Sequence, residues 1–292
     1  MSIIETKKLT KYYGKSRGII NLDLSVSEGE FFGFIGPNGA GKSTTIRTLL
    51  GLIYPTSGEA RIFGKDIIRD KTEILSDIGY MPSEATFYNG MKVKEIISLS
   101  AKIRKADCSA EADRLCERLA LDKEKRVDEL SLGNRKKVSI VCALQHKPRL
   151  CILDEPTSGL DPLMQKEFFD ILKERHSGGA TIFLSSHVLS EIQKNCSRAA
   201  IIKDGRLIAL DSVENLSKTS AKRVTLHGVT EIPGSLSARS VEINGDSVSF
   251  LYSGGIKNLL NSASALPIYD MTITEPTLDE IFMHYYEKGG EN

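Results

Sequence analysis

Residues 36–44 read Gly36-Pro37-Asn38-Gly39-Ala40-Gly41-Lys42-Ser43-Thr44. Their spacing is that of a Walker A loop, in which successive backbone N–H groups wrap a phosphate at the start of a helix. Glycines are needed because the loop visits backbone angles that a Cβ resists and because phosphates approach the main chain closely. The apolar stretch 30–35 predicts a strand before the loop, and the spacing of apolar residues in 43–52 predicts a helix after it. We therefore predict that all nine residues bind a nucleotide.

Two side chains of this loop have predicted roles of their own. Lys42 would place a positive charge at the β- and γ-phosphates, and the Ser43 hydroxyl would coordinate Mg²⁺. The start of the following helix adds a partial positive charge of the right sign. The sequence therefore predicts ATP or a related nucleotide, together with Mg²⁺, as the cofactors.

Composition limits the other classes of function. The chain has 292 residues, of which 40% are hydrophobic, so we expect one large domain and one small one. Lysine and arginine total 39 against 38 acidic residues, a net charge of +1 that gives no signal for a nucleic-acid partner.

Cysteine content and hydropathy bear on the compartment. The five cysteines have no CxxC spacing, which favours buried thiols in a reducing compartment over a metal site. Residues 1–14 are mixed and polar, unlike a signal peptide. No window approaches the roughly 18 uninterrupted apolar residues that span a bilayer. We therefore expect any membrane role to come through a partner.

A second acidic motif follows a buried strand. Residues 150–153 are apolar and lead into Asp154-Glu155-Pro156. Carboxylates at a strand tip fit a Walker B element, in which the first acid holds Mg²⁺ and the second works on a water molecule. An acidic turn is the structural alternative, and the phosphate loop upstream argues against it.

The phosphate loop makes two further side chains candidates for the nucleotide site. Tyr13 lies between the predicted strands 3–9 and 19–26 and could stack on a purine ring, although it could also be an ordinary strand aromatic. His187 follows the apolar strand 181–184, and ligands bind at the carboxyl ends of strands in open α/β sheets. We therefore predict that His187 contacts the γ-phosphate.

The chain is predicted to divide near residues 213–222, where Ser, Lys and Asn predominate. We expect an ATP-binding domain over 1–215, with a helical subdomain at about 84–146, and an α+β accessory domain over 222–292. The tail carries no catalytic constellation and is about 70 residues long, within the usual domain range. Its predicted strands are 223–226, 241–243, 248–252 and 268–273, and its predicted helices are 256–265 and 277–286.

Taken in order, these motifs resemble the nucleotide-binding domain of an ATP-binding cassette transporter over about residues 3–211. The remaining family positions are held by the signature Leu130-Ser131-Leu132-Gly133-Asn134 and by the D-loop Ser158-Gly159-Leu160-Asp161. The resemblance implies a RecA-like α/β core with an antiparallel β subdomain and a helical subdomain. It also implies that Tyr13, Ser131, Gly133 and Asp161 belong to the nucleotide site.

The tail carries a finer resemblance. Residues 275–282 read Glu275-Pro276-Thr277-Leu278-Asp279-Glu280-Ile281-Phe282, with Tyr285 and Tyr286 after them. This pattern is similar to the C-terminal extension of ATPase subunits from bacterial drug, antibiotic or lipid exporters. The resemblance therefore favours export over import.

The chain departs from the family pattern at two places. The family usually carries LSGGQ, whereas Leu132 and Asn134 replace a glycine and the glutamine here. Ser83 stands where the family has a glutamine that reaches Mg²⁺ or the attacking water. Serine is shorter, so either a water molecule bridges the gap or Glu84 substitutes, and Ser83 is kept as a candidate metal ligand.

The resemblance implies a mechanism and partners. Two cassettes, identical or different, would stack head to tail with ATP between the Walker A loop of one and Ser131 and Gly133 of the other. Glu155 would polarise the attacking water, His187 would contact the γ-phosphate, and Asp154 would hold Mg²⁺. ATP-driven dimerisation would power transmembrane permease subunits, which would contact residues 83–90 and the helix behind them. Phe87 and Tyr88 would there receive a short helix of the permease or, as the alternative, would be core aromatics. The chain would lie peripherally on the cytoplasmic face of the cell membrane.

Two alternatives belong to other classes. One is a cytosolic switch that acts on ribosomes or DNA, but those relatives carry two cassettes or a long coiled-coil insertion, which this chain lacks. The other is a cassette that binds nucleotide as a regulatory module without hydrolysing it. Ser83 favours that alternative, whereas Glu155 and His187 argue against it.

Overall fold

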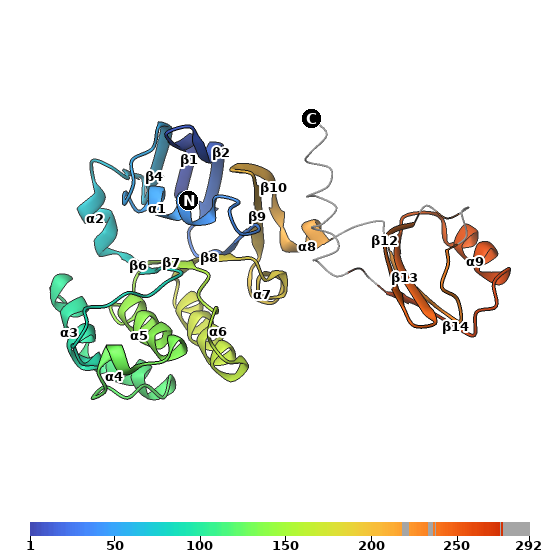
Figure 1. Ribbon diagram of the computed structural model, residues 1–292. Helices are drawn as coiled ribbons and strands as arrows, with labels where there is room; N and C mark the ends of the chain where they lie inside the picture. The colour runs from blue at the N-terminus through green and yellow to red at the C-terminus, as the bar shows by residue number, and fades with distance from the viewer. Residues whose placement is uncertain (218–221, 233–235, 237, 275, 277–292) are drawn as a thin grey trace. The chain divides into compact units, whose positions relative to one another are not determined.

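The structure is a computed structural model that describes residues 1–217, 222–232, 236, 238–274 and 276 (Figure 1). The chain divides into two compact units, Met1–Val213 and Glu214–Asn292, and each is described by itself.

A six-stranded sheet forms the centre of the first unit. The strand order is β10-β9-β3-β8-β7-β6, with β6, β7, β8, β3 and β9 parallel and β10 antiparallel to β9. The central strands are buried on both faces, which explains why their sequences read as continuous apolar runs. The bounds are Phe31–Ile35 for β3, Ile78–Met81 for β6, Leu150–Asp154 for β7, Thr181–Ser186 for β8, Arg198–Lys203 for β9 and Arg206–Ser212 for β10.

A second, antiparallel sheet has the order β2-β1-β4-β5. The long hairpin of β1 and β2 turns at Gly14, whose φ of 59° suits glycine. One face of the sheet joins the hydrophobic core, so buried and exposed residues alternate along much of β2. The bounds are Ser2–Tyr13 for β1, Ser16–Ser27 for β2, Ser57–Ile62 for β4 and Lys65–Asp66 for β5.

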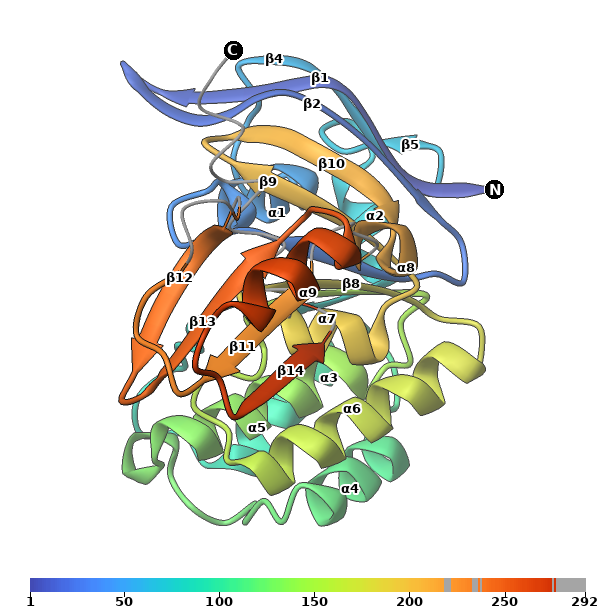
Figure 2. The ribbon, with the colours of Figure 1, turned by 90° about the vertical axis from the view of Figure 1, so that its right-hand side faces the viewer.

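Helices cover the parallel strands. Both views show the antiparallel sheet at one end of this unit and α3, α4 and α5 at the other, with the parallel strands between them (Figures 1 and 2). The α6 helix has Asp161 as N-cap and Pro162 at its first position, a favoured helix start. The bounds are Lys42–Leu49 for α1, Lys71–Ser76 for α2, Val93–Ile103 for α3, Ser109–Arg118 for α4, Leu132–Leu144 for α5, Pro162–Ser177 for α6 and Leu189–Asn195 for α7, with a 3₁₀ turn η1 at Val127–Glu129.

An ion-pair network joins α4 to α6. Glu111 of α4 pairs with Arg175 of α6, and Arg118 Nε of α4 lies 2.5 Å from Glu167 Oε1 of α6. These side chains are largely withdrawn from solvent, so their attraction is screened less than that of surface pairs. The network fixes the helical layer against the helix that follows β7.

The second unit has its own sheet and core. The sheet order is β12-β13-β11-β14, all pairs antiparallel. Val224, Phe250 and Leu259 lie in a hydrophobic cluster that joins the sheet to α9. The bounds are Lys222–His227 for β11, Ala238–Asn244 for β12, Ser247–Tyr252 for β13, Ile256–Ser264 for α9 and Asp270–Thr274 for β14, and α8 at Val213–Ser217 spans the boundary between the units.

Some sequence predictions concern residues that the structure does not describe, and two of its helices were not predicted. The predicted helix 277–286 lies outside the described residues, as do Glu275 and the two tyrosines of the tail pattern. The short helices α2 and α7 were not predicted, because six or seven residues give too little periodicity.

Three phenylalanines of β3 and β8 pack against one another in the hydrophobic core. Phe183 lies 5.6 Å from Phe32 and 5.4 Å from Phe34 between ring centroids, and all three are fully buried. We expect Phe183→Ala to lower the free energy of unfolding by about 3–5 kcal/mol, because it removes a large buried ring and leaves a cavity. Urea denaturation followed by circular dichroism measures the loss. The exposed Leu163 provides the control, and a Phe183→Ala variant as stable as Leu163→Ala would contradict the packing argument.

Candidate functional site

The phosphate loop leaves β3 and enters α1 as its spacing predicts. Gly41, the N-cap of α1, has a φ of 109°, where other residues are strained. A Cβ on Gly36 would lie 2.5 Å from the Ile202 carbonyl oxygen, so close approach to β9 also demands glycine there. The sequence thus places a ring of backbone N–H groups at a helix start, which is an anion site.

The loop borders a pocket of about 250 Å³. It contains most of the predicted Walker A residues together with Ser83 and Glu155. The lining residues are Arg17, Gly18, Pro37, Asn38, Gly39, Gly41, Lys42, Ser43, Thr44, Ser83 and Glu155. Gly36 and Ala40 are not among these lining residues. The Gly36 carbonyl accepts a hydrogen bond from Lys42, and Ala40 is buried.

Lys42 lines this pocket. Its buried ammonium donates to the Gly36 carbonyl at 2.6 Å and lies 3.0 Å from Glu155 Oε1. The other carboxylate oxygen of Glu155 is 2.7 Å from His187 Nδ1. The structure therefore brings together the three charged or titratable side chains that were predicted to act on the phosphates or on the attacking water, although His187 remains 50% exposed.

The backbone of Glu155 is held in an unusual conformation. Its φ is 47°, which is rare for a residue with a side chain. The Glu155 N–H donates to the backbone carbonyl and to the hydroxyl of Ser185, both at 3.2 Å, and its carbonyl accepts from Lys136 Nζ at 3.0 Å. Strain of this kind persists only where surrounding contacts fix it.

Asp154 offers an oxygen that suits a cation. The side chain is buried, Ser185 Oγ donates to its Oδ1 at 2.6 Å, and its Oδ2 has no hydrogen-bond partner among the described residues. An orphaned buried carboxylate oxygen is costly unless a ligand satisfies it. Mg²⁺ prefers carboxylate and hydroxyl oxygens, so Asp154 and Ser43 fit this ion.

Ser83 lines the pocket, and its backbone makes a contact that was not predicted. Its backbone carbonyl accepts a hydrogen bond from Lys136 Nζ at 2.6 Å. Glu84, the proposed substitute, is exposed. The role of the Ser83 hydroxyl as a metal ligand stays a prediction.

The remaining predicted residues lie at the rim or elsewhere. Tyr13 is 46% exposed, with Lys11 Nζ 5.5 Å from its ring centroid. A Cβ on Gly18, which lines the pocket, would lie 3.1 Å from Tyr13 Cε2, so the ring stands beside the pocket. Ser131 and Asp161, by contrast, are the N-caps of α5 and α6 and are not among the described residues that line it.

Gly133 lies close to the D-loop. A Cβ on Gly133 would lie 2.7 Å from the Gly159 carbonyl oxygen, so only glycine fits there. The signature and D-loop segments therefore meet each other, and the pocket of the same chain is completed by neither.

Sequence reasoning missed Lys136 and Ser185. Burial lowers the pKa of the Lys136 ammonium, while the negative charges of Asp154 and Glu155 act in the opposite direction. The available signal was position, since Lys136 is three and four residues before the buried Ser139 and Ile140 of α5. A lysine on the buried face of a helix needs a polar partner inside the protein.

Comparison with known proteins identifies the family. The ABC transporter family model matches residues 19–158. The bacitracin transport ATP-binding protein BcrA of Bacillus licheniformis is 35% identical over 97% of this chain and 96% of its own length. The probable multidrug ABC transporter ATP-binding protein YbhF of Escherichia coli is 33% identical over 75% of this chain and 39% of its own. A solved ATP-binding subunit of an ABC transporter superposes with a TM-score of 0.68 at 30% identity, covering 73% of this chain and 91% of the other.

The chain is an ATP-binding subunit of the ABC transporter family. The resemblance drawn from the motifs and the predicted α/β fold class, a P-loop ABC nucleotide-binding domain, are thereby confirmed. This ABC subunit binds ATP and hydrolyses it in support of transport. Subunits of this family form dimers and pair with transmembrane permease components. Of the helices that the structure describes, none combines the length and the apolar composition that crossing a bilayer requires.

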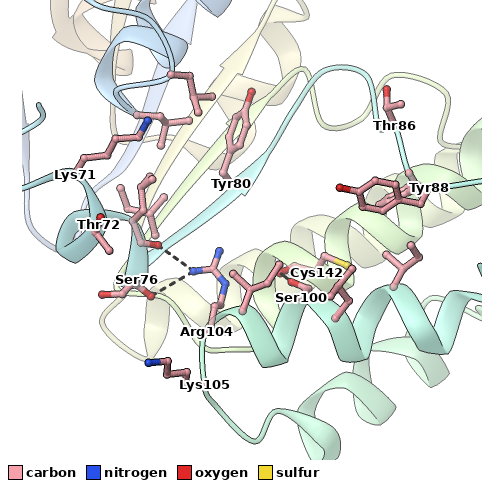
Figure 3. Close-up of a pocket in the computed structure, with 18 residues that line it drawn as sticks. Lys71, Thr72, Ser76, Tyr80, Thr86, Tyr88, Ser100, Arg104, Lys105 and Cys142 are labelled. Carbon is pink, nitrogen blue, oxygen red and sulfur yellow. Dashed lines mark hydrogen bonds between the residues drawn. The ribbon is translucent and has the colours of Figure 1, made fainter.

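A larger groove of about 940 Å³ lies on the first unit of the ABC subunit. Tyr80 of β6, the exposed Tyr88 and Arg104 are among the residues that line it (Figure 3). Arg104 donates to the Leu75 carbonyl at 3.0 Å, and burial lowers the pKa of its guanidinium. Apolar side chains of α3 and the segment before it make up much of the lining, including Phe87, Ile96, Leu99 and Ile103.

The carboxylate in the pocket generates a direct test. We expect Glu155→Gln to retain ATP binding while the turnover number falls by about 10²–10⁴-fold, because the amide cannot accept a proton from water. Equilibrium titration with MgATP and a phosphate-release assay measure the two quantities. Glu59→Gln on the exposed side of β4 serves as the matched control. Turnover of Glu155→Gln at the parental rate would remove Glu155 from the chemistry.

Proposed function

We propose that this chain is the ATPase subunit of an exporter, in which Glu155 orients the water that attacks the γ-phosphate. The observation that carries the proposal is the shared pocket, in which Lys42 Nζ lies 3.0 Å from Glu155 and His187 contacts the same carboxylate. Phosphoryl transfer needs an in-line water and charge stabilisation on the transferred oxygens. Glu155 meets the first need, while Lys42 and the backbone N–H groups of the phosphate loop meet the second.

The other roles follow from the same geometry. When bound, Mg²⁺ neutralises charge that develops on the phosphate oxygens. Asp154 and Ser43 would hold it, and Ser185 orients Asp154 through the 2.6 Å hydrogen bond. His187, half exposed beside Glu155, would contact the γ-phosphate. Tyr13 would stack on the adenine ring at the rim of the pocket.

The site is proposed to be completed by a second cassette. Ser131, Gly133 and Asp161 are not among the described residues that line the pocket. A head-to-tail pair would bring the exposed N-terminus of α5 from one subunit to the γ-phosphate of the other, where its N–H groups stabilise negative charge. Moving the closed pair from about 1% to about 99% requires a differential affinity of about 5.5 kcal/mol, which contacts formed only on closure would supply.

The names of two relatives support the proposed transport function. BcrA is named for bacitracin transport and YbhF for multidrug transport. We propose that this chain likewise powers export of a drug-like or antibiotic molecule, from a peripheral position on the cytoplasmic face of the membrane. The transported molecule itself would contact the permease.

We propose that this groove is the binding site for the permease. It is mostly apolar, it is open to solvent at Tyr88 and Ile103, and its Tyr80 and Thr86 flank Ser83 of the ATP pocket. An amphipathic helix inserts its apolar face into a groove of this kind. A short helix from a cytoplasmic loop of the permease therefore suits this surface.

Tyr88 provides a test of this contact. It is 72% exposed at the edge of the groove, so we expect Tyr88→Ala to weaken binding of the permease by about 1–2 kcal/mol, as loss of an interface aromatic does. Affinity of the full-length chain for the purified permease in detergent, and stimulation of ATP hydrolysis by it, both measure this loss. Tyr54, which is 69% exposed and outside the groove lining, is the matched control. Equal binding by the Tyr88→Ala and Tyr54→Ala variants would contradict the assignment.

A shortened chain tests the proposed domain organisation. The first unit ends at Val213, whose N–H is bonded to the Ser197 carbonyl at 2.9 Å. We expect a chain that ends at Val213 to bind MgATP within about threefold of the full-length affinity, a difference under about 1 kcal/mol. Titration with a fluorescent ATP analogue measures it. Loss of binding on shortening would show that the second unit is needed for the site.

A further inference from the structure

Lys136 is a buried cation next to the catalytic pocket. It is 2% exposed and lies near the start of α5, five residues after the signature Ser131. Its ammonium donates to the carbonyl oxygens of Ser83 at 2.6 Å and Glu155 at 3.0 Å, with that of Pro82 at 3.5 Å. One side chain of α5 thus joins the segments that follow β6 and β7.

The carbonyl contacts coincide with the strained backbone of the pocket. Glu155 has a φ of 47°, and its N–H is fixed by Ser185 of β8. Lys136 fixes the carbonyl on the other side of the same residue. The Glu155 backbone is therefore held between β8 and α5, and each contact restricts where its carboxylate points.

The neighbours of Lys136 on α5 serve different purposes. Arg135 donates to the Leu130 carbonyl in the turn that precedes its own helix. Lys137 is not buried. Any carbonyl oxygens could satisfy a buried ammonium. The two that receive the shorter hydrogen bonds of Lys136 belong to Ser83 and Glu155, and both of these residues line the ATP pocket.

We propose that Lys136 is a positioning residue that holds the Glu155 carboxylate and the start of residues 83–90 in register with the signature helix. The proposal rests on the proposed role of Glu155 in hydrolysis. In this proposal Lys136 contacts neither the substrate nor the attacking water, and it acts through the carbonyls of Ser83 and Glu155. Its ammonium sets the place of the catalytic carboxylate and of the segment that leads to the groove.

Lys136→Met is the principal test, because methionine keeps most of the length of the side chain and removes its three donors. We expect the full-length variant to bind MgATP within about threefold of the parent, since the phosphate loop is untouched. We expect its turnover number to fall by about 10–100-fold, the cost of misplacing a catalytic group by about 1 Å. Amides of residues 83–90 should exchange hydrogen faster than in the parent, because their anchor is lost.

Two further variants complete the experiment. Lys136→Gln keeps two N–H donors on a shorter stem, so its turnover should lie between those of the parent and Lys136→Met. Lys137→Gln, with the same charge change one residue along α5, should match the parent in turnover, ATP affinity and exchange.

The outcomes separate the proposal from its rivals. Parental turnover in folded Lys136→Met overturns it. Loss of ATP affinity in step with turnover, or loss of the folded state in both Lys136 variants, assigns a merely structural role and also overturns it. Glu155→Gln is measured alongside. If that variant turns over at the parental rate, the proposed role of Glu155 fails, whereas an inactive Glu155→Gln beside a fully active Lys136→Met refutes only the inference about Lys136.

Discussion

The register of three parallel strands is the constraint on which the site depends. Ile35 of β3 pairs with Ser186 of β8, and Asp154 of β7 pairs with Ser185 of β8. The three strands therefore end within a residue of one another, and the next residues along the chain open the phosphate loop, supply Glu155 and supply His187. Because side chains alternate along a strand, a slip of one residue would turn Asp154 away from Ser185, whose hydroxyl donates to its carboxylate. The apolar side chains on both faces of these strands oppose such a slip.

Much of this arrangement was predictable because its signals are local. The Walker A spacing, the apolar run before Asp154 and the apolar run before Ser185 each fix a strand and the loop after it, and parallel strands bring their carboxyl ends to one edge. The N-terminus of α5 at the signature is equally local, since Ser131 followed by a helical pattern is capping chemistry. Short helices such as α7 were not predictable, because seven residues carry little periodicity.

Contacts between segments that are distant in the chain could not be predicted from the sequence. Ser185 has no distinguishing mark in the stretch before His187, yet its hydroxyl bonds Asp154 and its carbonyl receives the Glu155 N–H. Lys136 meets carbonyls 53 and 19 residues away, and carbonyls leave no mark in the sequence. The prediction for Ser83 concerned its hydroxyl, and the hydrogen bond from Lys136 to its backbone carbonyl was not predicted. Motifs thus identify which side chains take part, and tertiary packing decides through which atoms they act.

The pocket and the groove share one short piece of chain. Tyr80 lines the groove and Ser83 lines the pocket, and between them β6 pairs with β7 at Met81 and Leu153. Because β6 is buried and hydrogen-bonded to β7, we expect a displacement of one end of β6 to move its other end as well. Beyond Met81 the chain leaves the sheet, and the Lys136 ammonium is the contact that ties Ser83 to Glu155. Ser83 and the residue that carries the carboxylate of the pocket are therefore joined through one cation, which donates to the backbone carbonyl of each.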